Sequence, residues 1–242
     1  MQKSKRARIL LFDLETIPNL AFVWGKFEQN VIAFKKEWEI LCFSWKWLGE
    51  KRIYFAKRGR DDLNLVKILH TLFKEADILI AHNGAKFDRK KANARFIYHG
   101  LTPPKITKLV DTCQIARNHF GFNSNSLNDL GEHLKLGKKM ETGGFQLWLD
   151  CMANKASAWE KMRRYNKMDV ELLEKIYLKF LPWVTNHPNI SMINGEPKYE
   201  GCPNCGSMNT IKRGIHANRQ GLQQQKSCND CGGYFLVPLK RE

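Results

Sequence analysis

Four carboxylates in three distant segments constrain the fold of this chain more than any other feature. Asp13 and Glu15 lie in Phe-Asp-Leu-Glu-Thr (12–16), Asp88 ends His-Asn-Gly-Ala-Lys-Phe-Asp (82–88), and Asp169 ends Tyr-Asn-Lys-Met-Asp (165–169). Carboxylate oxygens select hard cations such as Mg²⁺ or Mn²⁺. Two such ions roughly 4 Å apart can cleave a phosphodiester, one by activating water and the other by stabilising the leaving oxygen. We therefore expect a fold that brings these segments together around two divalent ions.

The spacing within two of the segments places pairs of side chains on one face. Asp13 and Glu15 occupy positions i and i+2 of an expected strand, so both project from one face while Leu14 points to the other. Tyr165 and Asp169 occupy positions i and i+4 of an expected helix and are neighbours, which brings a phenol close to a metal-activated water. Each segment alone is equally well explained as a turn or a helix cap. Their joint occurrence in suitable strand, loop and helix contexts favours one shared site.

The charge of the chain favours a polyanionic partner. Its 242 residues include 40 Lys and Arg against 24 Asp and Glu, a formal net charge of +16. Nucleic acid is the expected partner, and a membrane surface is the alternative. The apolar runs are only a few residues long, far short of a spanning helix, and the run 9–12 is too short for a signal-peptide core. We therefore expect an intracellular, non-secreted protein with no membrane partner.

Apolar strand-like runs alternate with amphipathic stretches from residue 8 to about 181. We expect strands at 8–12, 39–48, 52–56, 77–81 and 108–110, and helices at 61–74 (capped by Asp61), 89–98, 126–134 and 156–180. Asn166 is a candidate break in the last helix, and Asp111 is interpreted as a cap or a group supporting the site. Antiparallel strands followed by βα alternation favour an α/β fold, a ribonuclease H-like mixed sheet flanked by helices. This domain is expected to span residues 1–182.

The C-terminal part has a different composition and a second metal pattern. Turn-forming residues predict a linker at 183–200, followed by a small β zinc ribbon at 201–242. Cys202, Cys205, Cys228 and Cys231 form two Cys-x-x-Cys pairs, and a glycine follows each pair. Such thiolate turns are typical of one structural Zn²⁺, whereas a redox pair leaves the matching second pair unexplained. The other three cysteines, Cys42, Cys113 and Cys151, are interpreted as small buried side chains.

The three carboxylate segments resemble the motifs of DEDD-type (DnaQ-like) 3′-to-5′ exonucleases over residues 8–181. Asn83 also matches the second motif. The tyrosine subclass is favoured because Arg164 stands where the histidine subclass has its base. The resemblance implies that Asp13 bridges both metals, and that Glu15 and Asp169 complete the nucleophile-side metal. It also implies that Asp88 holds the leaving-group metal through water and that Tyr165 orients the attacking water.

The two cysteine pairs, Cys-Pro-Asn-Cys-Gly-Ser and Cys-Asn-Asp-Cys-Gly-Gly-Tyr-Phe, resemble the zinc ribbons of insertion-sequence transposases. That resemblance implies docking of nucleic acid or of a protein, and a replication or repair protein is the expected protein partner. The ribbon is therefore expected to bind and not to catalyse.

Residues beside the carboxylates are candidate substrate contacts. Positive charge gathers near the second and third segments and is expected to attract a phosphate backbone. The candidates are Leu14, Thr16, Asn83, Lys86, Phe87 and Arg164, although core packing explains Leu14 as well. We expect a two-metal 3′-to-5′ exonuclease acting on nucleic acid, with single-stranded DNA favoured over RNA. An endonuclease, an RNA-trimming ribonuclease and a non-catalytic nucleic-acid-binding adaptor are the alternatives.

Overall fold

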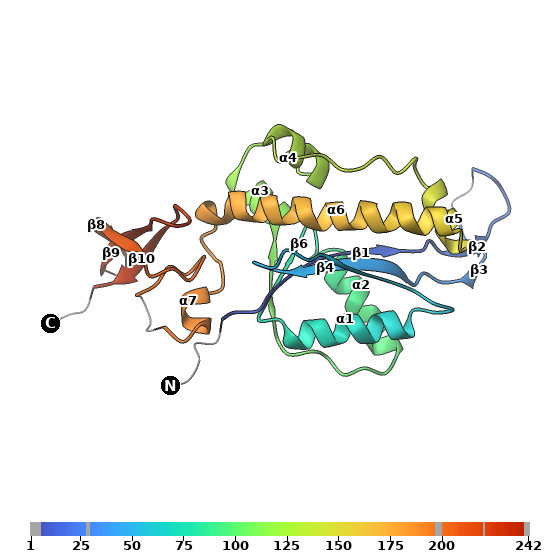
Figure 1. Ribbon diagram of the computed structural model, residues 1–242, viewed down its shortest axis with the longest axis horizontal. Helices are drawn as coiled ribbons and strands as arrows, with labels where there is room; N and C mark the ends of the chain where they lie inside the picture. The colour runs from blue at the N-terminus through green and yellow to red at the C-terminus, as the bar shows by residue number, and fades with distance from the viewer. Residues whose placement is uncertain (1–5, 28–29, 197–199, 220, 240–242) are drawn as a thin grey trace.

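The main sheet of the protein is mixed and has β1 at its centre. The computed structural model describes residues 6–27, 30–196, 200–219 and 221–239 (Figure 1). The strand order is β5-β4-β1-β6-β7. These strands are β1 (Ile9–Thr16), β4 (Ile40–Trp47), β5 (Tyr54–Lys57), β6 (Ile78–Ala81) and β7 (Lys108–Asp111). β1 runs antiparallel to β4 and parallel to β6, as the order of elements along the sequence predicts.

Helices cover both faces of this sheet. α1 (Leu63–Glu75) and α2 (Asp88–Tyr98) pack on one face, and α6 (Ala156–Phe180) crosses the other (Figure 1). The shorter helices are α3 (Thr112–His119), α4 (Leu127–His133), α5 (Gln146–Met152), the 3₁₀ helix η1 (Leu181–Trp183) and α7 (Ile190–Ile193). The architecture is therefore a three-layer α/β domain with β1 buried between helices.

The two faces of β1 explain where its carboxylates lie. Leu10, Phe12 and Leu14 pack in the core formed with α1 and α2, whereas Ile9 and Leu11 pack in the core beneath α6. Successive side chains of a strand point to opposite faces. The α6-facing row continues with two acidic residues, so the first carboxylate segment lies under α6.

α6 is one continuous helix of 25 residues, and the predicted break at Asn166 is wrong. Asn166 is fully buried, and its side-chain amide donates to the Oδ2 of Asp13 (2.7 Å) and to its backbone carbonyl (3.3 Å). A hydrogen bond to a charged group contributes about 1.5–3 kcal/mol, more than the roughly 0.7 kcal/mol by which asparagine disfavours a helix. A tertiary contact therefore outweighs local propensity here.

The helix α1 begins one residue later than the sequence predicts, because its cap position is Asp62 and not Asp61. Asp62 is fully buried and accepts two hydrogen bonds from Arg95 of α2 (2.6 and 2.7 Å). It also accepts one from the backbone N–H of Ile40 (2.9 Å). This carboxylate therefore joins β4 to α2 beneath the sheet.

Residues 183–196 of the expected linker contain α7 and contribute to the main core, and residues 197–199 lie outside the described structure. Val184 and Ile190 are buried in the core beneath α6. The side-chain amide of Asn204 donates to the carbonyls of Leu181 and Val184, at 2.9 Å each. These contacts hold the start of the C-terminal module against the end of α6.

Two further strand groups complete the described structure. β2 (Leu20–Phe22) and β3 (Ala33–Lys36) pair only with each other in an antiparallel hairpin, which the sequence pattern did not predict. β8 (Thr210–Asn218), β9 (Gly221–Cys228) and β10 (Tyr234–Pro238) form the three-stranded C-terminal sheet. This small sheet with its four cysteines agrees with the expected β ribbon.

Over the ranges that the structure describes, none of the helices combines the length and apolar character needed to cross a membrane.

Candidate active site

Carboxylates from β1 and α6 converge at one point between the sheet and the long helix. Asp13, Glu15 and Asp169 each offer an oxygen, and these oxygens lie within 4.8 Å of one another. Asp169 is almost completely buried, at 1% exposed, and the other two are partly buried. The structure therefore brings together three of the four carboxylates named from the sequence.

The electrostatics of this carboxylate cluster favour the binding of cations. Burial and the repulsion of Glu15, Asp169 and Asp88 raise the pKa of Asp13. Burial and repulsion by Asp169 raise the pKa of Glu15 to about 8. Burial also raises the pKa of Asp169. Buried like charges are unfavourable without a counter-charge, and divalent ions bound by carboxylate oxygens would supply it.

The fourth carboxylate, Asp88, lies beside the cluster but outside the three-residue group. Its Oδ1 accepts a hydrogen bond from the backbone N–H of Leu14 (3.1 Å), and the residue is 3% exposed. Burial raises the pKa of Asp88 to about 7 although that hydrogen bond lowers it. Asp88 at the start of α2 is thus held against β1, close enough to repel the carboxylate of Asp13.

Lys139 is a site residue that the sequence analysis missed. Its Nζ lies 2.7 Å from Oδ2 of Asp169 and donates a hydrogen bond to the hydroxyl of Tyr165 (3.1 Å). Burial alone would lower the pKa of Lys139, but the carboxylate of Asp169 outweighs it and raises that pKa. Tyr165 and Asp169 are thus adjacent on α6, as predicted, and one ammonium group bridges them. No sequence pattern marks Lys139, because it lies in the irregular segment between α4 and α5.

Two further residues support the cluster. Asn166 holds the carboxylate of Asp13 by the hydrogen bond from α6. Trp148 of α5 contacts the ring of Tyr165 edge to face, with 6.1 Å between ring centroids. Trp148 also lies near the carboxylate of Glu15 and opposes the rise of its pKa. These side chains come from elements distant in sequence and were not predicted.

A cavity of about 540 Å³ opens beside Asp13 and Lys139. Asn83, Arg117 and Asn125 also line it, so it combines amide groups with a guanidinium next to the carboxylates. This polar, basic lining is suited to a phosphate-bearing ligand.

The loop 82–87 beside that cavity is fixed by hydrogen bonds. Asp111 caps α3, as the sequence predicts, and also accepts from the backbone N–H groups of Asn83 (2.8 Å) and Ala85 (3.0 Å). The ring of His82 bonds the hydroxyl of Thr112 and the carbonyl of Asn125, at 2.9 Å each. Asn83 adopts a φ of +60°, a left-handed conformation that asparagine tolerates better than most residues.

The other predicted substrate contacts differ in exposure. Leu14 is 2% exposed and packs in the core with α1 and α2, so its side chain is not available to stack on a base. Phe87, Lys86 and Arg164 are exposed, and Thr16 is partly buried at the end of β1. Core packing is therefore the role that the structure supports for Leu14.

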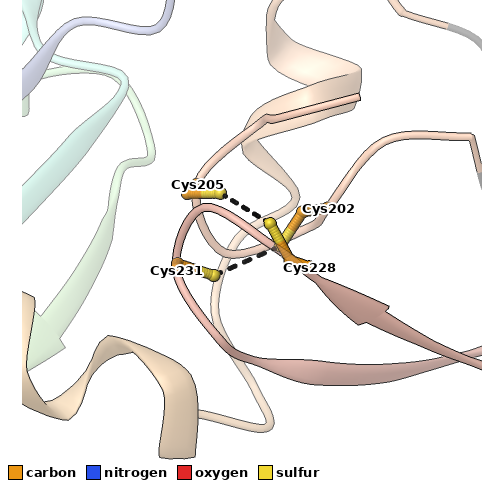
Figure 2. A group of neighbouring side chains, drawn as sticks. All are labelled: Cys202, Cys205, Cys228 and Cys231. Atoms are coloured by element: carbon orange, nitrogen blue, oxygen red, sulfur yellow. Dashed lines mark hydrogen bonds between the residues drawn. The ribbon is translucent and has the colours of Figure 1, made fainter. Parts of the chain in front are cut away.

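The four cysteines of the C-terminal module face one another at two turns (Figure 2). The Sγ atoms of Cys202 and Cys231 lie 3.7 Å apart, and those of Cys205 and Cys228 lie 3.5 Å apart. Four thiolates bound tetrahedrally at about 2.3 Å from Zn²⁺ would lie about 3.8 Å apart, and a disulfide would need about 2.05 Å. The spacing therefore fits a shared metal ion and not two disulfides.

Comparisons with known proteins identify the family and the fold of this chain. A family model described as RNase_H superfamily matches residues 35–181, more than half of the chain; the match begins after β1. The fold is similar to that of the family B DNA polymerase from the hyperthermophilic archaeon Pyrobaculum calidifontis, with a TM-score of 0.57 and 15% identity. The similarity covers 89% of this chain and 31% of the polymerase chain, so this chain spans about a third of that protein. No curated protein matches the sequence.

The family match and the mixed five-stranded sheet with helices on both faces confirm the ribonuclease H-like fold expected from the sequence. The chain therefore belongs to the RNase H superfamily.

Proposed function

We propose that this protein is a two-metal-dependent 3′-to-5′ exonuclease of the DEDD type, tyrosine subclass, with single-stranded DNA as its favoured substrate. The convergence of Asp13, Glu15 and Asp169 within 4.8 Å, with Tyr165 one helical turn from Asp169, supports this proposal most strongly. Membership of the RNase H superfamily supports nucleic-acid hydrolysis in general. The direction of cleavage and the substrate follow from the motif resemblance.

Asp13, Glu15 and Asp169 would hold the two Mg²⁺ or Mn²⁺ ions, with Asp88 as the fourth carboxylate. When bound, such ions supply charge neutralisation and a water nucleophile of lowered pKa. Asn166 holds the carboxylate of Asp13 in place by a hydrogen bond (2.7 Å). A hydrogen-bond partner of this kind fixes the orientation of a side chain that ligates a metal.

Tyr165 would act as a hydrogen-bonding group and not as a base. Burial and the carboxylates of Asp169 and Glu15 raise the pKa of Tyr165, so its phenol stays protonated at neutral pH. A protonated phenol one turn from Asp169 can orient water by donating or accepting a hydrogen bond. Lys139 donates a hydrogen bond to the phenol oxygen (3.1 Å) and so helps to fix the orientation of the hydroxyl group.

Basic groups near the carboxylates support a nucleic-acid substrate. Arg117 and Lys139 line the adjacent cavity, and Lys86 and Arg164 are exposed on the loop before α2 and on α6. The similarity to a DNA polymerase favours DNA over RNA. The net charge of +16 agrees with binding to either polyanion.

We further propose that one structural Zn²⁺ binds Cys202, Cys205, Cys228 and Cys231. The sulfur separations of 3.5 and 3.7 Å support it. The resulting zinc ribbon would dock nucleic acid or a replication or repair protein and take no part in catalysis.

Degradation of 5′-labelled single-stranded and duplex DNA and RNA, with Mg²⁺, Mn²⁺ or EDTA, tests the activity. We expect a ladder of products shortened from the 3′ end, with metal only and with single-stranded DNA cut fastest. Asp13→Ala and Asp169→Ala should abolish the ladder while the circular dichroism spectrum stays unchanged. Asp150→Ala is the matched control, because Asp150 of α5 pairs with Lys155 away from the cluster (2.8 Å).

Each other outcome identifies a different function. Internal cuts would identify an endonuclease, and shortening of RNA alone would identify an RNA-trimming enzyme. Retarded but intact strands would identify a binding adaptor. Full activity in both carboxylate variants would refute the assignment of the site.

A further inference from the structure

The hairpin formed by β2 and β3 exposes an unusual number of large apolar side chains. We call its described residues, 20–27 and 30–36, the aromatic hairpin. Trp24 is 87% exposed and Phe27 is 88% exposed. Phe22 and Phe34 are also exposed, together with Leu20, Val23, Val31 and Ile32. So concentrated an apolar surface on a short segment is typical of an interaction site.

The aromatic hairpin does not belong to the main sheet. Among the described strands β2 pairs only with β3, and a two-stranded hairpin without further packing is marginally stable in water. Its side chains therefore contribute little to the core. Figure 1 shows the hairpin at the end of the molecule where α5 and the start of α6 lie.

The hairpin is continuous with the carboxylate site along the chain. β1, which carries Asp13 and Glu15, ends at Thr16, and β2 begins at Leu20. Residues 17–19 alone separate the two strands, so the hairpin starts within about 14 Å of the end of β1.

A second connection runs through α2. Phe87 precedes the carboxylate Asp88, and the Nζ of Lys91 lies 5.8 Å from the ring centroid of Phe87. The same Nζ lies 3.6 Å from the ring centroid of Trp38. The backbone N–H of Trp38 donates to the side chain of Asn19, just before β2 (2.8 Å). A row of aromatic rings and one ammonium group thus leads from the site to the base of the hairpin.

The charge of the hairpin matches a polyanion. Residues 17–36 contain three lysines and one glutamate. Lys26 and Lys35 are exposed, and Lys26 lies 5.8 Å from the ring centroid of Phe27. Aromatic rings interleaved with cations stack on bases and hold phosphates, which is how single strands are bound without sequence preference.

We propose that the aromatic hairpin binds the single-stranded nucleic acid a few nucleotides upstream of the terminus held at the carboxylates. This inference rests on the proposed nuclease function, because the site fixes where the strand ends. Trp24 and Phe27 stack on bases, and Lys26 and Lys35 contact the backbone. The row formed by Phe87, Lys91 and Trp38 lies between the two.

The test compares strand binding with cleavage of a minimal substrate. Affinity for a labelled oligothymidylate of about 20 nucleotides, longer than a single binding groove usually spans, is measured in EDTA. The W24A/F27A variant should bind it at least about thirtyfold more weakly, the change expected for losing base stacking on two aromatic rings. Its hydrolysis of bis(p-nitrophenyl) phosphate with Mn²⁺ should equal that of the unmodified protein, because that ester is too short to reach the hairpin.

Two variants control for unrelated effects. Trp183→Ala removes another exposed aromatic ring, on η1 after α6, and should leave oligothymidylate binding unchanged. Trp24→Phe keeps a stacking ring and should retain most of the affinity. Both hairpin residues are almost fully exposed, so the double variant should keep the circular dichroism spectrum of the parent protein.

Other occupants of the hairpin give different results. Unchanged strand affinity in W24A/F27A would overturn the proposal. If the unmodified protein sediments as a dimer and W24A/F27A as a monomer with unaltered strand affinity, the occupant is a second copy and the proposal fails. Binding to phosphatidylserine vesicles that is lost in W24A/F27A while strand binding persists would overturn it in favour of a membrane surface. Failure of the unmodified protein to cleave any phosphodiester would refute the proposed function. The binding measurement in EDTA does not depend on cleavage, so it tests the hairpin separately.

Discussion

Replacing Glu15 by Gln should stabilise the metal-free protein, because folding then no longer requires this side chain to take up a proton on entering a crowded acidic cluster. The pKa of Glu15 rises from 4.5 to about 8 through burial and the repulsion of Asp169. Between these values the folded state holds a proton that the unfolded state has lost, so the stability of the protein falls as pH rises through this window.

The magnitude follows from the width of that window. From pH 4.5 to pH 7 the proton held by Glu15 lowers the free energy of unfolding by about 3 kcal/mol, at about 1.4 kcal/mol for each pH unit. Glu15 is partly open to solvent, which reduces the expected effect to about 1–2 kcal/mol. The free energy of unfolding of Glu15→Gln in EDTA at pH 7 should exceed that of the parent protein by this amount. Near pH 4 the difference should vanish, because Glu15 is then largely protonated in both states.

Urea unfolding followed by tryptophan fluorescence measures both quantities. Mn²⁺ should then reverse the order, since it stabilises the folded parent protein by mass action and binds the variant less tightly. Glu160→Gln is the control, because Glu160 is exposed on α6 and pairs with Arg163 (2.8 Å). A Glu15→Gln variant that is no more stable than the parent in EDTA at pH 7 would refute the charge-crowding argument. A gain that persists undiminished at pH 4 would do the same.

Three further perturbations have distinct signatures. Arg95→Met removes the guanidinium partner of the buried Asp62 carboxylate, which keeps only His99 (2.7 Å) and the N–H of Ile40, and should lower the free energy of unfolding by up to about 3–5 kcal/mol in urea titrations. Lys155→Met, at an exposed ion pair, should change it little. Lys139→Met should lower kcat about tenfold to a hundredfold with little change in KM, because Lys139 contacts both Asp169 and Tyr165. Steady-state cleavage assays measure both constants, and an unchanged kcat would exclude Lys139 from the site. Cys205→Ser should reduce the zinc content measured by mass spectrometry. It should also lower the Tm of the whole protein, because Cys205 packs against the main core. Full zinc occupancy in that variant would contradict the four-thiolate site.

The parts of the site that were predictable are those fixed by local periodicity. The two-residue alternation of β1 places Asp13 on the same face as Leu11, and the α6-facing core confirms that alternation. The four-residue spacing of Tyr165 and Asp169 holds on α6 because that helix is continuous. Such patterns depend only on strand and helix geometry, so they are readable without a structure.

The unpredicted residues depend on tertiary contacts. Lys139 meets Asp169 from an irregular segment, and nothing in its neighbours marks it as different from the other lysines of a strongly basic chain. Asn166 was interpreted as a break because its propensity disfavours helix, and the bond to Asp13 became visible only when β1 and α6 were placed together. The aromatic hairpin was missed for a related reason, since its exposed residues follow no buried-to-exposed alternation.

The continuity of α6 gives the C-terminal module a physical connection to the candidate site. Asp169 lies eight residues before Tyr177, about 12 Å along the helix axis. Tyr177 is fully buried, and its hydroxyl shares a hydrogen bond with the ring of His187 (2.9 Å). Burial raises the pKa of Tyr177 most, and the nearby thiolates of Cys205 and Cys231 raise it further. Because the same rigid helix carries a carboxylate of the cluster and a contact to the cysteine turns, loss of the ribbon metal should loosen the end of α6. Hydrogen exchange of α6 with and without a zinc chelator would detect this as faster exchange from its C-terminal end, decreasing toward Asp169.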